Sequence, residues 1–315
     1  MDQEQLRKRF KAGFLAASKN FDENDLNVDL SGKSFMLNGA NTGIGKRVTM
    51  ELAKRGGTVH MICQHADEKT RKEIVEKTGN MNIHLHVLEL SKPRDVYDFA
   101  TKFAEGWKEL HVLVNNAADV VKTRDITEYG LETNFAINTM GPYLLTKTLL
   151  PTINRTPGSR VVMVSTGGVY KEKLNLSDLN NEHMEPFDGH DCYTRSKRQQ
   201  LIMNETWAKE YPNVHFSTMR PGIVDTPLLY KYLPVERIQI MRANDILRTP
   251  EQGADTIVWL CAAEKVAQQP NAQFYLDRSV VPEHLPGLDT DSSFEEKRQL
   301  MRYLEKLADD VRKDA

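Results

Sequence analysis

The sequence predicts a three-layer α/β fold, in which helices cover both faces of a doubly wound parallel sheet of about seven strands. Short apolar runs typical of strands alternate with longer amphipathic segments between residues 31 and 280. Strands that are separated by helices form parallel sheets, because each crossover returns the chain in the same direction. The runs that we expect to form strands are residues 34–39, 58–63, 83–90, 111–117, 160–166, 215–222 and 273–277.

Helical patterns fill the intervals between these strands, for instance at residues 46–54, 94–103, 141–153 and 194–210. Parallel sheets of this kind bind their ligands at the carboxyl ends of the strands. We therefore expect the functional motifs to lie just after strands, which gives a test of the assignment.

The composition excludes several classes of function. With 40% hydrophobic and 27% charged residues, the chain has the composition of a globular protein with a sizeable core. A formal net charge of −2 and the lack of a contiguous basic face argue against nucleic acid as a partner. No apolar run approaches the roughly 18 residues that span a bilayer, and the N-terminus lacks the apolar stretch of a signal peptide. Cys63, Cys192 and Cys261 are widely spaced and odd in number, so we expect reduced thiols and a cytoplasmic protein.

Two segments lie outside the alternation and are expected to be helical extensions of a single domain at residues 31–290. Residues 1–30 carry apolar side chains at helical spacing with basic residues between them: Leu6, Phe10, Phe14, Ala17 and Phe21. This helix either packs on its own domain or lies on a membrane surface through residues 1–24. Residues 291–315 carry a second stripe, which indicates a docking or lid helix or, alternatively, a frayed tail: Leu300, Leu304, Leu307 and Val311.

A glycine-rich loop, NGANTGIG at residues 38–45, closes the first predicted strand and opens the first helix. Gly39, Gly43 and Gly45 permit a tight turn and a close approach of backbone to a ligand. The amides at the start of the following helix face an anion. Within a βαβ unit, this arrangement predicts a site for the phosphates of a nucleotide.

Two stretches contain Tyr-x-x-x-Lys: Tyr143 with Lys147, and Tyr193 with Lys197. The lysine of each pair lies one helical turn after the tyrosine and on the same face. A free tyrosine has a pKa near 10, too high for an efficient proton acceptor near neutral pH, and a nearby positive charge would lower it. About 0.7 such pairs are expected by chance in a chain of this composition, so the spacing alone leaves the choice open.

The chain resembles the short-chain dehydrogenase/reductase family, whose glycine fingerprint is Thr-Gly-x-x-x-Gly-Ile-Gly. Its other signatures follow in order: NNAA (115–118), Asn138 within FAINTMG, VSTGG (164–168), YTRSK (193–197) and RPGIVDT (220–226). Segments KRGGTVHMIC (54–63) and EQGADTIVWL (251–260) further resemble one subgroup of the family. The resemblance implies a Rossmann-type NAD(P)-binding domain and an oxidoreductase that transfers a hydride to or from the cofactor.

The resemblance also separates the two tyrosines. It places the catalytic tyrosine at the start of the helix after the fifth strand, which is the position of Tyr193. Lys197 would then stabilise the phenolate together with an oxidised nicotinamide, and would bind the nicotinamide ribose. Tyr143 lies in an earlier helix among leucines, where packing is its expected role.

Two further catalytic positions follow from the resemblance. Thr166 holds the place of the hydroxyl that faces the substrate oxygen, and Ser165 takes the role if the register slips by one residue. Threonine still donates that hydrogen bond, although its methyl group restricts the rotamer. Asn138 matches an asparagine whose helix distortion anchors a water in the family's proton relay.

The cofactor-binding residues that the resemblance implies come from six segments of the chain. They are Gly39, Asn41, Thr42, Gly43, Ile44, Gly45, Gln64, Glu89, Leu90, Asn116, Ala117, Tyr193, Lys197, Pro221, Gly222, Val224 and Thr226. Three positions depart from the family pattern: Asn38 replaces a threonine, Ala118 a glycine and Glu89 an aspartate. Each substitute is small or chemically close, so we expect cofactor binding to be retained.

NADP is the expected cofactor, with NAD as the alternative. The second strand ends at Cys63 and Gln64, without the carboxylate that binds the ribose 2′-hydroxyl in NAD enzymes. Lys46, Arg47 or Lys69 would supply positive charge for a 2′-phosphate. No metal site is expected, because His60, His84 and His86 read as ordinary histidines of a sheet.

The substrate is expected to bind between the segments after the fifth and sixth strands, roughly residues 167–192 and 227–249. The second segment is largely apolar, which favours a lipophilic alcohol or carbonyl compound over a sugar. A non-catalytic, NAD(P)-binding redox sensor or scaffold is the alternative function. The resemblance further implies a homodimer through helices at 141–153 and 194–210, a contact that the terminal extensions would block or replace.

Overall fold

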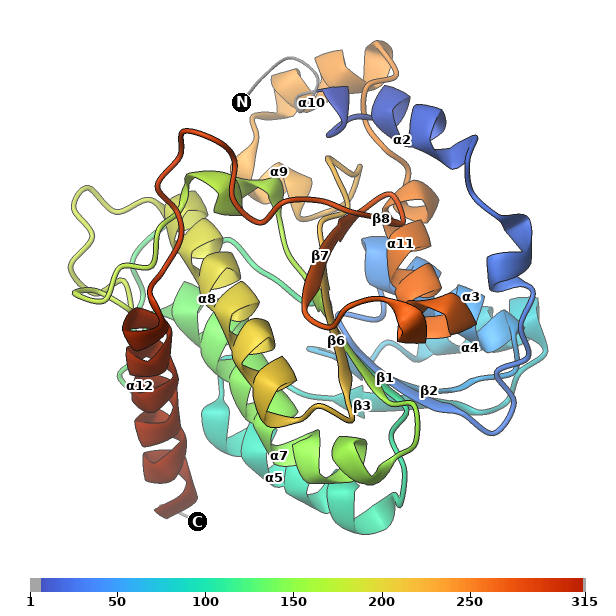
Figure 1. The fold of residues 1–315 in the computed structure, drawn as a ribbon, viewed down its shortest axis with the longest axis horizontal. Coiled ribbons are helices and arrows are strands. Elements are labelled where there is room, and N and C mark those ends of the chain that lie inside the picture. Colours follow the sequence, from blue (N-terminus) through green and yellow to red (C-terminus); the bar gives the residue numbers. More distant parts are fainter. Residues whose placement is uncertain (1–6, 314–315) are drawn as a thin grey trace.

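The computed structural model describes residues 7–313, which fold around one eight-stranded sheet with the strand order β3-β2-β1-β4-β5-β6-β7-β8 (Figure 1). Strands β1 to β7 are parallel. The strands are β1 (Ser34–Asn38), β2 (Thr58–Cys63), β3 (Ile83–Val87), β4 (Val112–Asn115), β5 (Arg160–Val164), β6 (His215–Met219), β7 (Gln273–Leu276) and β8 (Ser279–Val280). The predicted fold class is confirmed, and all seven predicted strands occur.

The short edge strand β8 is the one that the sequence did not reveal. It pairs antiparallel with β7 through a two-residue turn at Asp277 and Arg278. Both turn residues have positive φ, 52° and 56°, as the turns that match the twist of a hairpin require. With two residues, β8 is too short to show an alternating pattern.

Several strands end earlier than the sequence predicts, and always at their carboxyl ends. For example, β3 ends at Val87 where residue 90 was expected, and β6 ends at Met219 where residue 222 was expected. The residues that leave the sheet are those of the predicted motifs. They read as strand because they directly follow a buried apolar run, but they turn away from the sheet at its carboxyl edge.

Two layers of helices cover the sheet (Figure 1). One face packs on α3 (Gly43–Lys54), α4 (Glu68–Thr78) and α11 (Pro250–Ala262). The other packs on α5 (Pro93–Gly106), α7 (Gly141–Arg155) and α8 (Gly189–Glu210). Successive side chains of a strand enter opposite cores: Phe35 and Leu37 enter the first and Met36 the second. Burial on both faces explains why these strands read as continuous apolar runs.

Shorter helices shape the loops at the carboxyl edge of the sheet. They are α6 (Thr133–Phe135), η2 (Ala136–Met140), η3 (Gly167–Lys171), α9 (Leu229–Tyr232) and α10 (Val235–Ala243), whereas η4 (Glu264–Gln268) joins α11 to the amino end of β7. The second of these is a π-helical turn that joins α6 to α7. Helices α9 and α10 form the apolar segment after β6 that was expected to bind substrate.

The N-terminal extension packs on the domain that follows it, through α2 (Lys11–Ser18) and η1 (Glu23–Leu26). The ring of Phe14 is buried under the guanidinium of Arg248, and the ring of Phe21 lies under that of Arg278. Lys11 pairs with Asp245 at 2.6 Å. Of the predicted apolar series, Leu6 lies outside the described residues, and Phe10, Phe14 and Phe21 contact the protein itself.

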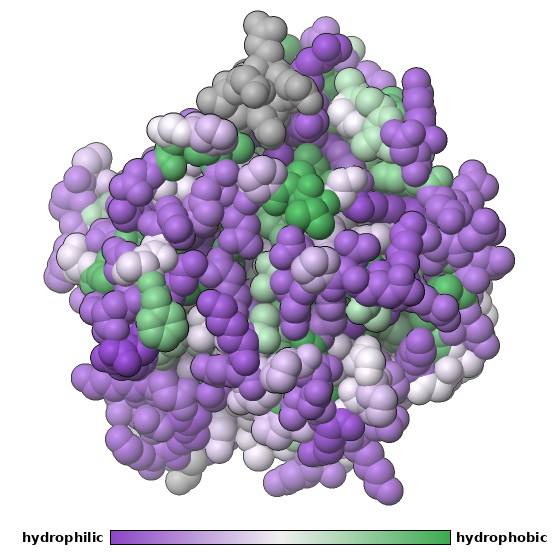
Figure 2. Space-filling model, in the orientation of Figure 1, coloured by the Kyte–Doolittle hydropathy of each residue, from purple (hydrophilic) through white to green (hydrophobic). Residues whose placement is uncertain are grey.

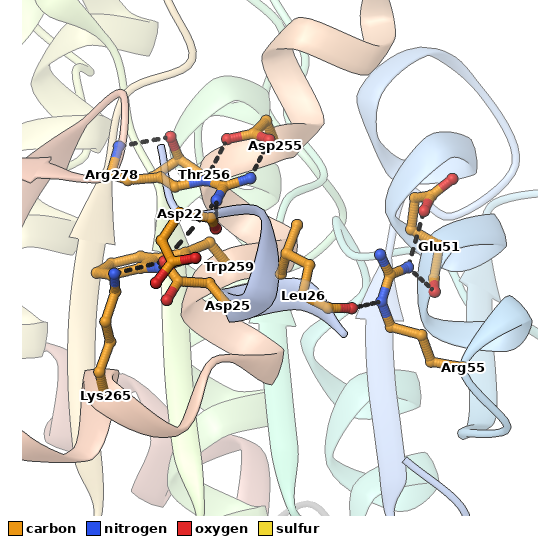
Figure 3. A network of polar contacts seen from close by, with 10 residues as sticks. All are labelled: Asp22, Asp25, Leu26, Glu51, Arg55, Asp255, Thr256, Trp259, Lys265 and Arg278. Atoms are coloured by element: carbon orange, nitrogen blue, oxygen red, sulfur yellow. Dashed lines mark hydrogen bonds and ion pairs between the residues drawn. The ribbon is translucent and has the colours of Figure 1, made fainter. Parts of the chain in front are cut away.

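A polar network ties η1 to α11 and α3 (Figure 3). The carboxylate of Asp25 accepts a hydrogen bond of 2.9 Å from the indole of Trp259 and pairs with Lys265 at 2.5 Å. Arg278 forms two hydrogen bonds with Asp255, of 2.8 and 2.6 Å. On the α3 side, Arg55 donates to the carbonyl oxygen of Leu26 at 2.9 Å. The extension is therefore held by specific contacts at several points.

The C-terminal helix α12 (Phe294–Lys313) lies along the outside of α5, α7 and α8 (Figure 1). Leu300, Leu304 and Ala308 are buried in the same core as these helices. Lys297 pairs with Glu205 of α8 at 2.7 Å. This arrangement agrees with a docking helix, with Ala308 in the buried stripe and Leu307 only partly buried.

Over residues 7–313, no helix is both long enough and apolar enough to cross a bilayer. Figure 2 shows a face on which hydrophobic residues form small, separate patches in a mostly hydrophilic surface.

Candidate active site

A cavity of about 340 Å³ opens at the carboxyl ends of the strands, where the motifs were expected. Its wall contains most of the residues that the resemblance assigned to the cofactor. These are Gly39, Asn41, Thr42, Gly43, Ile44, Gly45, Gln64, Glu89, Leu90, Asn116, Ala117, Tyr193, Lys197, Pro221 and Thr226. Gly222 and Val224 are the exceptions, since neither lines the cavity; Gly222 instead lies against Arg248 and the carbonyl of Arg9, and Val224 lies against Gly253.

The glycines of the first loop are required by its geometry. Gly39 and Gly43 have positive φ, 67° and 49°. A Cβ on Gly45 would lie 2.0 Å from the carbonyl oxygen of Gly39, so no side chain fits there. The loop is thus a bare backbone cradle that ends at the N-terminus of α3, as an anion site for the phosphates of a dinucleotide requires.

Asn38 connects this loop to the end of β4. Its Oδ1 accepts hydrogen bonds from the backbone amides of Asn116 and Ala117, at 2.7 and 2.6 Å. Its Nδ2 donates to Oδ1 of Asn115 at 2.9 Å. A carboxamide accepts and donates through two separate atoms, whereas a threonine would have to make all three bonds through one shorter-reaching hydroxyl oxygen. The departure from the family fingerprint therefore has a structural reason.

Tyr193 and Lys197 lie in the first turns of α8, whose N-terminus is capped by Asp188 through the amides of His190 and Asp191. Both side chains are buried and line the cavity, and Nζ of Lys197 lies 5.8 Å from the centroid of the Tyr193 ring. Lys197 donates to the carbonyl oxygen of Val164 at 2.8 Å and to Oε1 of Gln200 at 3.0 Å.

Burial dominates the titration of this pair. It lowers the pKa of Lys197 to about 7, because a charged ammonium loses its hydration. It raises the pKa of Tyr193 above its ordinary value; Tyr232 adds to the rise, and a hydrogen bond with Thr166 opposes it. A lowered Tyr193 pKa was expected from Lys197 and an oxidised nicotinamide. In the protein alone the desolvation of the phenolate is the largest effect on the pKa of Tyr193, which therefore moves the other way.

Tyr143 is a packing residue, as predicted. Its ring stacks on Trp207 with the centroids 5.6 Å apart, and its hydroxyl donates to Glu305 of α12 at 2.5 Å. Its partner in the motif, Lys147, lies 3.5 Å from the same carboxylate. Burial and the Glu305 carboxylate both raise the pKa of Tyr143. The second Tyr-x-x-x-Lys therefore joins α7 to α12, and neither of its side chains lines the cavity.

Thr166 and Ser165 follow β5 and lie beside Tyr193 in different ways. Thr166 is hydrogen-bonded to Tyr193 and also accepts from the amide of Gly168 at 3.3 Å. Ser165 lines the cavity, and its buried Oγ has no hydrogen-bond partner among the described residues. Thr166 is therefore the hydroxyl in contact with the tyrosine, while Ser165 is the hydroxyl in the cavity wall.

Asn138 lies in the π-helical turn, where a helix distortion was expected. Its Oδ1 accepts from the amide of Asp119 at 3.0 Å, and its Nδ2 donates to the carbonyl of Asp119 and to that of Asn134, both at 2.9 Å. The side chain thus clamps the loop after β4. Its backbone carbonyl accepts a hydrogen bond from Nε2 of Gln200.

An ion pair across the cavity was missed at the level of sequence. Lys231 of α9 contacts both carboxylate oxygens of Asp119, at 2.5 and 2.7 Å, and both residues line the cavity. Asp119 directly follows the NNAA motif, which is the only signal that the sequence offered. Lys231 lies in a variable segment, where no motif marks it.

Of the three positive charges predicted to bind a 2′-phosphate, two are already paired. Lys46 forms an ion pair with Glu73 at 2.7 Å, and Arg47 forms one with Glu251. Gln64 donates to the carboxylate of Glu89. The carboxylate of Asp67 caps α4 and accepts from Asn41 of the glycine loop at 3.2 Å. Neither Cys63 nor Gln64 provides a carboxylate at the end of β2.

Within residues 7–313, the histidines and cysteines do not form a cluster that could hold a metal ion. His60, His84 and His86 stack on one another against Trp107 and neighbouring rings. Burial lowers the pKa of His60 to about 3. The three cysteines are free and buried, and burial raises the pKa of each thiol to about 12, so none is a ready nucleophile.

Comparison with known proteins agrees with this geometry. A model of the short chain dehydrogenase family matches residues 33–177. The human protein Dehydrogenase/reductase SDR family member 12 is 44% identical over 305 residues, which cover 96% of this chain and 95% of the human one. This similarity confirms the subgroup that segments 54–63 and 251–260 indicated. Human Retinol dehydrogenase 11 is 30% identical over 256 residues, which cover 80% of this chain and 77% of the relative.

Solved structures support the fold. A short chain dehydrogenase from Escherichia coli CFT073, complexed with NADPH, superposes with a TM-score of 0.63 at 19% identity and covers 82% of this chain and all of its own. The ordered motifs, the cavity they surround and the similarity over nearly the whole chain have one explanation: this chain belongs to the short-chain dehydrogenase/reductase family and is an oxidoreductase of that family.

Proposed function

We propose that this protein transfers a hydride between NADP(H) and a lipophilic alcohol or carbonyl compound. The observation that carries the proposal is that Lys197 and Tyr193, which is hydrogen-bonded to Thr166, line the same cavity as the glycine loop. A cofactor on the loop would bring its reactive ring to the tyrosine. When bound, the nicotinamide supplies or accepts the hydride.

The residues of the chain fit a dinucleotide. The amides at the start of α3 would hold the pyrophosphate, because the loop leaves no Cβ in the way at Gly45. Asn116 and Ala117, fixed by Asn38, would line the middle of the cofactor, and Lys197 would donate to a ribose hydroxyl. The expected fit to a dinucleotide thus depends on the backbone of the glycine loop and on Lys197.

Tyr193 would handle the proton. In the reducing direction its hydroxyl donates a proton to the carbonyl oxygen of the substrate, and in the oxidising direction its phenolate accepts one from the alcohol. The raised pKa of Tyr193 in the protein alone means that its hydroxyl is protonated, the form that donates. Thr166, or Ser165 from the cavity wall, would hold the substrate oxygen by a second hydrogen bond.

A lipophilic substrate is supported by the second half of the cavity and by relatives. Pro227 and Leu228 line the cavity, and α9 and α10 place an apolar cluster beside it. Relatives at about 30% identity are named retinol dehydrogenases, such as human Retinol dehydrogenase 11. NADP is supported by the missing carboxylate at the end of β2 and by a structural neighbour that holds NADPH. The ion pairs of Lys46 and Arg47 and the position of Asp67 favour NAD as the alternative.

The test is a panel of hydrophobic carbonyls and alcohols assayed with NADPH, NADP, NADH and NAD. We expect turnover that is abolished in Tyr193→Phe and retained in Tyr143→Phe, a matched control that removes a hydroxyl outside the cavity. Tight cofactor binding by calorimetry with no turnover on any compound would contradict the proposal. That result would favour a redox sensor or scaffold, which the Asp119–Lys231 ion pair across the cavity also fits.

A membrane-surface role for residues 1–24 is a separate proposal. Liposome flotation of the full chain and of a form that lacks these residues tests it. Binding that depends on the segment supports peripheral attachment. No binding by the full chain, or equal binding by both forms, contradicts it.

The expected homodimer would use helices α7 and α8, which α12 covers in this structure. Sedimentation of the full chain in the same buffer tests whether it forms.

A further inference from the structure

Gln200 lies one turn after Lys197 on α8 and connects two predicted catalytic residues. Its Oε1 accepts a hydrogen bond of 3.0 Å from Nζ of Lys197. Its Nε2 donates to the backbone carbonyl oxygen of Asn138 in the π-helical turn. The side chain is fully buried, and no family signature included it. One carboxamide thus joins the catalytic helix to the distorted turn.

The hydrogens of Lys197 show what this contact does. A lysine ammonium has three donors and no acceptor. The carbonyl oxygen of Val164 takes one of them and Gln200 takes a second. One N–H therefore remains, and Lys197 itself lines the cavity. Because the two acceptors come from β5 and α8, they fix the direction of that remaining donor.

Gln200 also bears on the charge of Lys197. Burial favours the neutral amine, and two acceptors at hydrogen-bond distance oppose that effect by stabilising the ammonium. Tyr193 is the titratable group that lies against Nζ, while β5 and η2 contribute Val164, Ser165 and Asn138, none of which titrates. Glu89 and the Asp119–Lys231 pair are further charged groups of the cavity wall. Among the described groups that contact Nζ directly, only Val164 and Gln200 accept its hydrogens.

We propose that Gln200 is a positioning residue of the active site, which keeps Lys197 protonated and directs its one remaining hydrogen into the cavity. The inference rests on the proposed function for its catalytic meaning, but the interaction itself can be measured without turnover.

Gln199 provides a matched control. It is the neighbouring residue of the same helix, is 3% exposed, and also bridges two elements through both ends of its amide. Its Oε1 accepts from Thr139 at 2.7 Å and its Nε2 donates to the carbonyl of Leu179 at 2.9 Å. It has no contact with Lys197. Loss of Gln199 therefore reports the structural cost of removing a buried glutamine from this helix, without the effect on the lysine.

The decisive experiment follows the Nζ resonance of Lys197 by NMR across pH in protein labelled with ¹⁵N-lysine, with the signal assigned from its absence in Lys197→Met. In Gln200→Met we expect the pKa of Lys197 to fall by about one unit, since a hydrogen bond to a charged group is worth roughly that much. In Gln199→Met it should stay at the wild-type value. Gln200→Glu keeps the shape and adds a negative charge, so it should raise the pKa.

Equal shifts in Gln200→Met and Gln199→Met would overturn the proposal, as would an unchanged or lowered pKa in Gln200→Glu. If Gln200→Met does not fold, the comparison of Gln200→Glu with wild type decides the matter. Where turnover is found, the alkaline limb of kcat for carbonyl reduction should move in the same directions as the resonance. A wild-type protein without turnover on any compound would contradict the proposed function, and the NMR titration would still decide the role of Gln200.

Discussion

Replacing Asn38 with alanine should destabilise the protein strongly, although the residue reacts with nothing. The side chain is 1% exposed and makes three hydrogen bonds, to Asn115 and to the amides of Asn116 and Ala117. A net hydrogen bond contributes about 1 kcal/mol, and a buried partner that is left without one costs more. We therefore expect Asn38→Ala to lower the free energy of unfolding by about 3 kcal/mol.

Urea unfolding followed by tryptophan fluorescence measures this change, provided that the free energy of unfolding falls with urea concentration at the same slope in both proteins. Asn38→Thr, which introduces the residue of the family fingerprint, restores only part of the three bonds and should give an intermediate loss. NADPH affinity measured by calorimetry should fall in the same order, because the freed amides belong to the cavity wall. A loss below about 1 kcal/mol in Asn38→Ala would refute the reasoning, since it would mean that solvent replaces these bonds.

Three other predictions concern the rest of the molecule. Asp25→Ala removes the partner of Trp259 and Lys265, so it should release the N-terminal extension, which limited proteolysis would detect as faster cleavage before residue 30. The folded pKa of His60, about 3, lies below its value in an unfolded chain, so the unfolded state binds more protons as the pH falls below about 6.5. The free energy of unfolding should therefore drop between pH 6.5 and 4, and urea unfolding at these two pH values measures the drop. His60→Phe should reduce it. An equal drop in both proteins would contradict the linkage. Lys231→Met breaks the ion pair with Asp119 across the cavity and should speed the dissociation of cofactor in stopped-flow fluorescence; an unchanged rate would show that the pair does not restrict the cavity.

Tyr193 shows how much of the candidate site could be predicted from the sequence. The spacing of Tyr193 and Lys197, the glycine loop and the order of the motifs are local patterns, and each needs only a few neighbouring residues to be recognised. The alternation of apolar strands and amphipathic helices is local in the same sense, because periodicity reports which faces are buried. For this reason the fold class, the seven main strands and the edge of the sheet that carries the site could all be predicted.

Other features depend on residues far apart in the chain, and only the tertiary structure decided them. Asn38 meets Asn115 across 77 residues, and Gln200 meets Asn138 across 62, through the register of neighbouring elements. Whether a Tyr-x-x-x-Lys faces a cavity or a second helix is decided by what packs on it, as Tyr143 and α12 show. The same holds for the direction of the Tyr193 pKa, since burial by surrounding elements is the largest cause of its rise. Sequence alone thus determined the elements and the chemistry they carry, whereas packing determined the partners of each group, because contacts between distant segments exist only once the sheet has formed.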